Sequence, residues 1–145
     1  FKDDNDLYNI HCRSLGYKGY IFYGIGGSSL TPFSTWIEYS EELLKEMILK
    51  AGMYPANKLV IVTHTPPYGV LDKILYGEHV GSKALRNFLE KHQPLLWITG
   101  HIHESRGVVK VGSTVIVNPG PLMRKYYALI ELDAAKKPSI TLCRL

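Results

Sequence analysis

The chain has few cysteines and no long apolar stretch. Of its 145 residues only Cys12 and Cys143 are cysteines, and they form neither a Cys-x-x-Cys pair nor a disulfide framework. Such usage is typical of a reducing compartment, where cysteine serves as a small apolar side chain. No apolar run is long enough for a signal peptide or a membrane-spanning helix. These absences predict a cytoplasmic protein without a membrane partner.

Clustered charge and internal repeats are also lacking. The net charge is +4 and the pI is about 9.0, but no run of Lys or Arg is longer than two residues. Proteins that bind nucleic acid usually gather their basic residues on one face or segment. We therefore interpret the basic residues as solvated surface and expect a nucleic acid only as a substrate.

What is present is a chain able to fold around a core. It is 46% hydrophobic and has the size of one domain. In the first two thirds, apolar runs and helix caps predict strands that alternate with helices. The predicted strands are 19–24, 59–62 and 95–98, and the predicted helices are 40–52 and 82–94.

The last third has a different pattern. Short apolar runs at 108–111 and 114–117 flank Gly112-Ser113, a two-residue linker of the kind that closes a hairpin. Two further runs follow at 127–132 and 140–143. The whole pattern predicts an α/β fold with a mixed sheet whose C-terminal strands are antiparallel.

Three histidines follow two of the predicted buried strands. His64 comes after 59–62, and His101 and His103 come after 95–98 in Gly100-His101-Ile102-His103. Ligand sites of α/β proteins lie at the carboxyl ends of such strands. Neutral imidazole binds Mn, Fe, Ni and Zn, so these three residues are candidate metal ligands.

An isolated His before Pro residues, followed later by Gly-His-x-His, resembles the C-terminal half of calcineurin-like metallophosphoesterases. The resemblance implies a two-sheet β-sandwich flanked by helices, of which this chain is a part. It also implies that His64 and His101 bind one metal and His103 the other. The expected cofactors are two divalent ions (Mn, Fe, Ni or Zn), and the expected activity is hydrolysis of a phosphomonoester or phosphodiester.

The family's upstream Asp-x-His, Gly-Asp-x-x-Asp and Gly-Asn motifs are absent from the sequence. Each ion needs about four to six ligands and the pair needs a bridging carboxylate, which three imidazoles do not supply. We therefore expect residues 1–145 to be a single domain that forms the C-terminal portion of the family's domain. Its partner would be the missing N-terminal half, and this segment alone would be inactive, with no assignable catalytic proton donor.

Weaker candidates lie around the histidines. Glu104 is placed to orient a His, whereas Tyr68 and Asp72 either line a substrate pocket or belong to the turn that starts at Pro66. Asn118 begins an Asn-Pro-Gly segment that predicts a tight turn, and in the resembled family a similar segment lies close to the metals. The remaining histidines, His11, His79 and His92, are expected to be surface or packing residues.

Two alternative functions stay open. The first is a catalytically inactive protein-interaction scaffold on the same fold. The second is a self-contained site in which His64, His101 and His103 bind one Zn and leave a fourth position open. Metal binding by the complete protein would distinguish an enzyme from the inactive scaffold.

Overall fold

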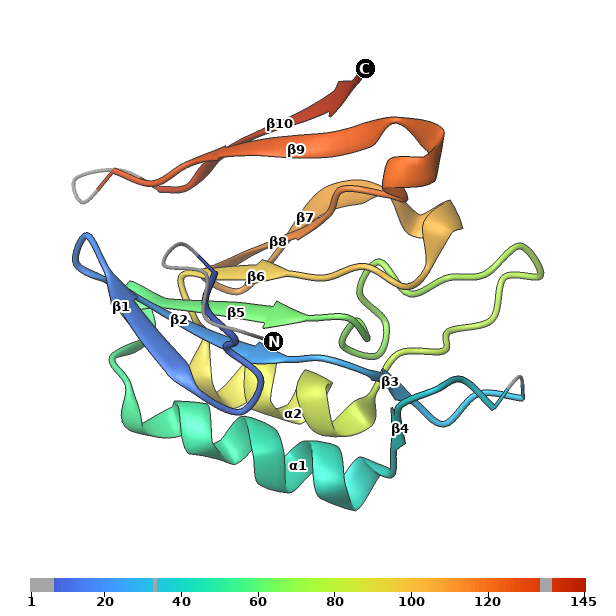
Figure 1. The fold of residues 1–145 in the computed structure, drawn as a ribbon, viewed down its shortest axis with the longest axis horizontal. Helices are drawn as coiled ribbons and strands as arrows, with labels where there is room; N and C mark the ends of the chain where they lie inside the picture. The colour runs from blue at the N-terminus through green and yellow to red at the C-terminus, as the bar shows by residue number, and fades with distance from the viewer. Residues whose placement is uncertain (1–6, 33, 134–136) are drawn as a thin grey trace.

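The computed structural model describes residues 7–32, 34–133 and 137–145. Two helices cover one face of a six-stranded sheet, and a two-stranded sheet lies on the opposite face (Figure 1). The α/β architecture with a mixed sheet is thus confirmed, as is the antiparallel character of the C-terminal strands.

The helices are α1 (Glu41–Leu49) and α2 (Lys83–His92). In the described part of the chain they are accompanied by the 3-10 helices η1 (Lys50–Met53), η2 (Ala56–Lys58), η3 (His103–Ser105) and η4 (Leu122–Arg124). The strands are β1 (Ser14–Tyr17), β2 (Tyr20–Ile25), β3 (Ser28–Ser29), β4 (Glu38–Tyr39), β5 (Leu59–Thr63), β6 (Leu96–Ile98), β7 (Gly107–Val111), β8 (Thr114–Asn118), β9 (Tyr126–Glu131) and β10 (Ser139–Arg144).

The large sheet has the order β1-β2-β5-β6-β8-β7. Strands β2, β5, β6 and β8 are parallel to one another, and β1 and β7 pair antiparallel at the two edges. Because the four central strands are parallel, their carboxyl ends share one end of the sheet. The histidines predicted from sequence follow β5 and β6 at that end.

Strand β1 is an element that sequence patterns missed. Ser14–Tyr17 has no apolar run and is largely exposed, as an edge strand allows. It pairs with β2 across Lys18 and Gly19, which both have positive φ (47° and 83°). That combination is typical of a type I′ hairpin turn.

Both helices begin at the predicted caps. The Ser40 and Ser82 hydroxyls accept the backbone N–H groups of Leu43 (3.3 Å) and Leu85 (3.2 Å). Helix α1 is shorter than expected, because the chain continues after Leu49 as a 3-10 turn. Helix α2 ends as predicted before Pro94.

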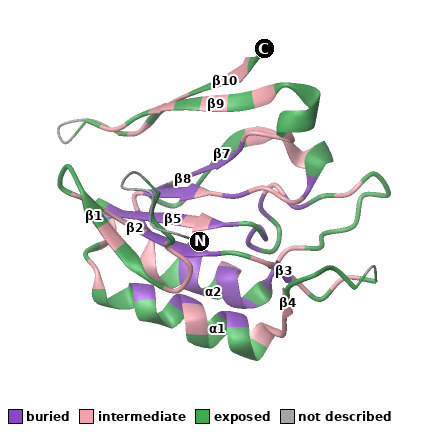
Figure 2. Ribbon diagram, in the orientation of Figure 1, coloured by how far each residue is buried: buried purple, intermediate pink, exposed green. Residues whose placement is uncertain are grey.

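The central strands are buried on both faces, which fixes the position of their carboxyl ends. On the helix side, Ile61 and Trp97 pack with α1 and α2. On the other side, Val60, Leu96 and Val117 pack against the β9–β10 hairpin. Figure 2 shows the buried residues concentrated along β2, β5 and β8 and the inner sides of the helices.

No helix in the described parts of the chain is both long enough and apolar enough to cross a membrane.

Candidate metal centre

Backbone hydrogen bonds between neighbouring strand ends hold His64 in place. Its N–H donates to the carbonyl of Ile25 (3.3 Å) at the end of β2. Its own carbonyl accepts the Gly100 N–H (3.1 Å) and the Thr99 hydroxyl (3.3 Å) beyond β6. The two chain segments that carry the histidines are therefore joined directly to each other.

The side chains of His64 and His101 face one another. His64 Nε2 and His101 Nδ1 lie 3.0 Å apart, and the ring centroids are 4.7 Å apart with the rings steeply inclined. His101 has φ 62°, in the left-handed region that non-glycine residues rarely adopt. Such a backbone is maintained only where surrounding contacts impose it, and here it turns the ring toward His64.

Burial lowers the pKa of both histidines, and the neighbouring His103 lowers each of them further. The pKa of His101 is also lowered by His64 and raised slightly by the carboxylate of Glu38. These influences favour the neutral imidazole, the form that binds metals. His103 itself is exposed at the start of η3.

The 3.0 Å separation of the His64 and His101 nitrogens is compatible with adjacent ligand positions on one metal ion. An ion about 2.1 Å from each nitrogen would subtend an angle of about 90° between nitrogens 3.0 Å apart, as between adjacent ligands of an octahedron. Within the described residues, however, no three His, Cys, Asp or Glu side chains are gathered closely enough to hold a metal. The ligand roles of His64, His101 and His103 stay predictions.

Asn118 holds the backbone of the Gly-His-x-His segment through side-chain hydrogen bonds. Its side chain is almost completely buried, and Nδ2 donates to the carbonyl of Ile102 (2.8 Å) and reaches that of Gly100 (3.5 Å). Its Oδ1 accepts the N–H of Gly120 (3.0 Å). Asn118 ends β8, which is parallel to β6, so it lies beside the segment that follows β6.

Asp72 fastens the loop between β5 and α2. Its buried carboxylate accepts the N–H groups of Gly69 and Gly81 (2.9 Å each) and pairs with His79 Nδ1 (2.6 Å). The ring of Tyr68, which is exposed, lies 5.7 Å from that of His79. Asp72 thus has a structural task here, and the pocket roles of Asp72 and Tyr68 are untested.

Ser105 joins this loop to η3, which sequence reasoning did not reveal. Its hydroxyl donates to the Lys73 carbonyl (2.7 Å) and accepts the Lys73 N–H (2.9 Å). A single serine carries no sequence signal for such a link. The neighbouring Glu104 is exposed, and within the described residues it has no hydrogen bond to any of the three histidines. Its predicted orienting role stays a prediction.

The segment between β2 and α1, in which the sequence patterns predict neither a helix nor a strand, contains the parallel pair β3–β4. The Ser29 N–H donates to Thr65 Oγ1 (2.9 Å), next to His64. Hydrogen bonds from the Thr31 hydroxyl (2.6 Å) and the Thr35 N–H (2.7 Å) lower the pKa of Glu38 to about 2. The base of the loop therefore contacts the residue that follows His64, and the charge of Glu38 raises the pKa of His101.

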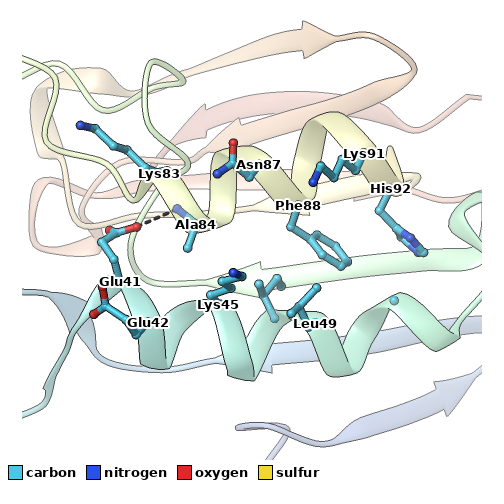
Figure 3. Close-up of a pocket in the computed structure, with 12 residues that line it drawn as sticks. Glu41, Glu42, Lys45, Leu49, Lys83, Ala84, Asn87, Phe88, Lys91 and His92 are labelled. Atoms are coloured by element: carbon cyan, nitrogen blue, oxygen red, sulfur yellow. Dashed lines mark hydrogen bonds between the residues drawn. The ribbon is translucent and has the colours of Figure 1, made fainter.

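The described surface includes two cavities near the elements discussed above. One of about 870 Å³ lies beside His64 and is also lined by His11 and Arg13. The other, of about 540 Å³, lies between α1 and α2 (Figure 3), and none of the three candidate ligands lines it. At its end, Glu41 accepts the Ala84 N–H (2.7 Å), a contact that joins the two helices.

Helices on one face of a mixed sheet, with paired histidines at the carboxyl ends of its parallel strands, define an α/β protein with a candidate metal centre. A sequence model for the metallophosphoesterases of the calcineurin superfamily matches residues 7–140. The chain therefore belongs to this family, which confirms the resemblance carried by its histidine motifs.

Relatives by sequence include proteins from archaea and animals. An uncharacterized protein of Methanocaldococcus jannaschii is 40% identical over 105 residues, which are 69% of this chain and 48% of that protein. The human metallophosphoesterase domain-containing protein 1 is 30% identical over 106 residues, covering 70% of this chain and 31% of that protein. The chain thus spans about half the length, or less, of these curated relatives.

Solved structures show the same fold. One crystal structure matches 93% of this chain and 53% of its own, with a TM-score of 0.74 and 26% identity. A crystal structure of a Thermus thermophilus protein matches 94% of this chain and 58% of its own, with a TM-score of 0.64 and 22% identity. The second likeness shows the fold alone.

Proposed function

We propose that the protein is a metal-dependent hydrolase of phosphate monoesters or diesters, and that this chain supplies part of a centre for two divalent ions. The observation that carries the proposal is the pair of facing nitrogens of His64 and His101, 3.0 Å apart at the carboxyl ends of parallel strands. Membership of the metallophosphoesterase family supports it.

In this proposal His64 and His101 hold one ion and His103 its neighbour, with Mn, Fe, Ni or Zn as the metals that imidazole suits. Two such ions would acidify a water and neutralise charge on the phosphate oxygens. The chain's own contribution is positioning. Asn118 holds the backbone of the Gly-His-x-His segment, and Ser105 fastens the residues that follow His103 to the neighbouring loop.

The test compares this chain with the longer protein that includes its upstream coding region. Metal content and hydrolysis of bis-p-nitrophenyl phosphate are measured on both. We expect about two ions per chain and metal-dependent turnover only in the longer form.

Two matched substitutions test whether the activity depends on the candidate metal ligands. His101→Ala should remove bound metal and at least about 10-fold of the activity. His92→Gln is the control, because His92 bonds the Tyr54 carbonyl (3.0 Å) and stacks on Phe88, away from the candidate ligands. A longer protein that neither binds metal nor hydrolyses the ester would instead favour the scaffold.

A further inference from the structure

Helices α1 and α2 run side by side in the same direction and leave a groove between them (Figure 3). Glu41 meets the Ala84 N–H (2.7 Å) where both helices begin, and His92 meets the Tyr54 carbonyl (3.0 Å) where both have ended. The α2 wall is ten residues long, which at 1.5 Å per residue is roughly 15 Å. The volume of the groove is about 540 Å³, within the range of about 300–1,000 Å³ that is typical of small-molecule sites.

The floor of this groove is apolar and already held in place. Ile48 and Phe88 line it and are only 1% and 6% exposed. The Phe88 ring stacks on His92 (centroids 4.9 Å apart) and meets the ring of Trp97 edge-on (6.2 Å). Gly52 contributes no side chain beside that ring, so the groove stays open there. A ligand would therefore find a formed apolar surface and would not have to order it.

The acidic side chains of the groove are engaged where the helices begin. Glu41 Oε2 accepts the Ser82 hydroxyl (3.0 Å) and the Ala84 N–H (2.7 Å). Hydrogen bonds from its own backbone N–H and from Ser40 lower the pKa of Glu42. The negative charge of the groove is therefore confined to the end where the positive poles of the helix dipoles stabilise it.

Further along, the charged side chains that line the groove are Lys45 on α1 and Lys91 on α2, on opposite walls (Figure 3). Neither forms an ion pair with a residue that the structure describes, although Glu42 lies within electrostatic reach of Lys45. The third lysine, Lys83, holds its ammonium over the ring of Tyr68 (5.6 Å) instead. The groove thus combines an apolar floor with one available cation on each wall.

We propose that this groove binds an unbranched aliphatic chain that ends in a carboxylate, with the chain over Phe88 and the carboxylate paired with Lys45 and Lys91. Apolar floor and cationic walls match the two parts of such a ligand. A narrow chain can enter the space between two packed helices, whereas a third helix, about 10–12 Å across, would rest on their rims. None of the three candidate metal ligands lines the groove, so the proposal goes beyond the proposed hydrolase and does not depend on it.

Calorimetric titration of the longer protein with octanoate, decanoate and dodecanoate, each below its micelle concentration, provides the test. We expect the Kd to fall by about 2- to 4-fold for each added CH₂, the larger value being that of a fully buried methylene. Decyltrimethylammonium, which has the same chain and the opposite charge, should bind at least about 10-fold more weakly than decanoate.

Substitutions in the two walls separate the charge from the shape of the groove. Lys45→Gln combined with Lys91→Gln should weaken decanoate binding by about 2- to 30-fold, because each ion pair at a surface contributes about 1.4- to 5-fold. Lys110→Gln combined with Lys125→Gln is the control, since both lysines are exposed and line neither wall.

A larger side chain at Gly52 should fill the groove. A Cβ there would lie 3.7 Å from Phe88 Cε2, an ordinary contact, so Gly52→Leu should fold and lose decanoate binding. Gly16→Leu is its control, because a Cβ at Gly16 in β1 meets nothing within 4 Å. Urea midpoints show whether each variant is folded, and the lysine variants decide the matter if Gly52→Leu is not.

Amide chemical shifts locate the bound ligand. Decanoate should move the signals of Gly52 and Ala84, whereas shifts confined to Gly100 would place the carboxylate at the candidate metal centre and overturn the proposal. A Kd that is independent of chain length, or equal for decanoate and decyltrimethylammonium, also overturns it. Binding of an acidic amphipathic helical peptide without binding of decanoate would assign the groove to a protein partner instead. Hydrolysis of a phosphate ester enters none of these outcomes, so the two proposals can fail separately.

Discussion

Replacing Asn118 by Ala tests whether this side chain positions the Gly-His-x-His segment. The substitution removes one donor and one acceptor from a site that is only 1% exposed. The Ile102 carbonyl loses its 2.8 Å hydrogen bond and the Gly120 N–H its 3.0 Å hydrogen bond. The weaker 3.5 Å contact to Gly100 is lost as well.

The expected loss of stability follows from these two well-formed hydrogen bonds. Each polar group left without a partner costs about 1–3 kcal/mol, so the loss of two partners should lower the free energy of unfolding by about 2–6 kcal/mol. The segment from Gly100 to His103 should also loosen. Displacing such supporting groups typically weakens metal binding by about 10- to 100-fold.

Urea unfolding measures the stability, and Mn titration of the longer protein measures the affinity. Asn87→Ala is the matched control, because Asn87 is exposed on α2 and its substitution should change stability by less than about 0.5 kcal/mol. If Asn118→Ala unfolds within about 0.5 kcal/mol of the unsubstituted chain, the hydrogen bonds described for Asn118 do not support this segment.

Two further predictions concern the same end of the sheet. The pKa of His64 and that of His101 are lower in the folded chain than the usual 6.5, so protonation of these residues favours unfolding. The stability that their neutral forms contribute should be fully present above pH 6.5. It should be lost as the pH falls through the lowered pKa values. Urea midpoints measured from about pH 8 to 5 should therefore drop less in a double His→Gln variant, and equal pH profiles would refute this. Asp72→Ala should lower the free energy of unfolding by about 2–4 kcal/mol and speed amide exchange at Gly69 and Gly81, whose N–H groups lose their acceptor. Unchanged exchange at both glycines would contradict it.

Local signals were sufficient for most elements of the fold. Serine caps at Ser40 and Ser82 and the Gly112 hairpin turn predict their elements because each acts on neighbouring backbone groups. Strand β1 was missed, since its pairing partner rather than its own composition makes it a strand. The pair β3–β4 was missed for the same reason, being only two residues long on each side.

The sequence by itself determined the family and the candidate ligands, because His64 and Gly100 to His103 form a motif that needs no tertiary information to be read. Only the tertiary structure decided which polar groups support them. The hydrogen bonds of Asn118 and Ser105 join residues 16 and 32 positions apart. A contact of that kind leaves no periodicity in the chain, because it arises from the parallel order of the strands that brings their carboxyl ends together.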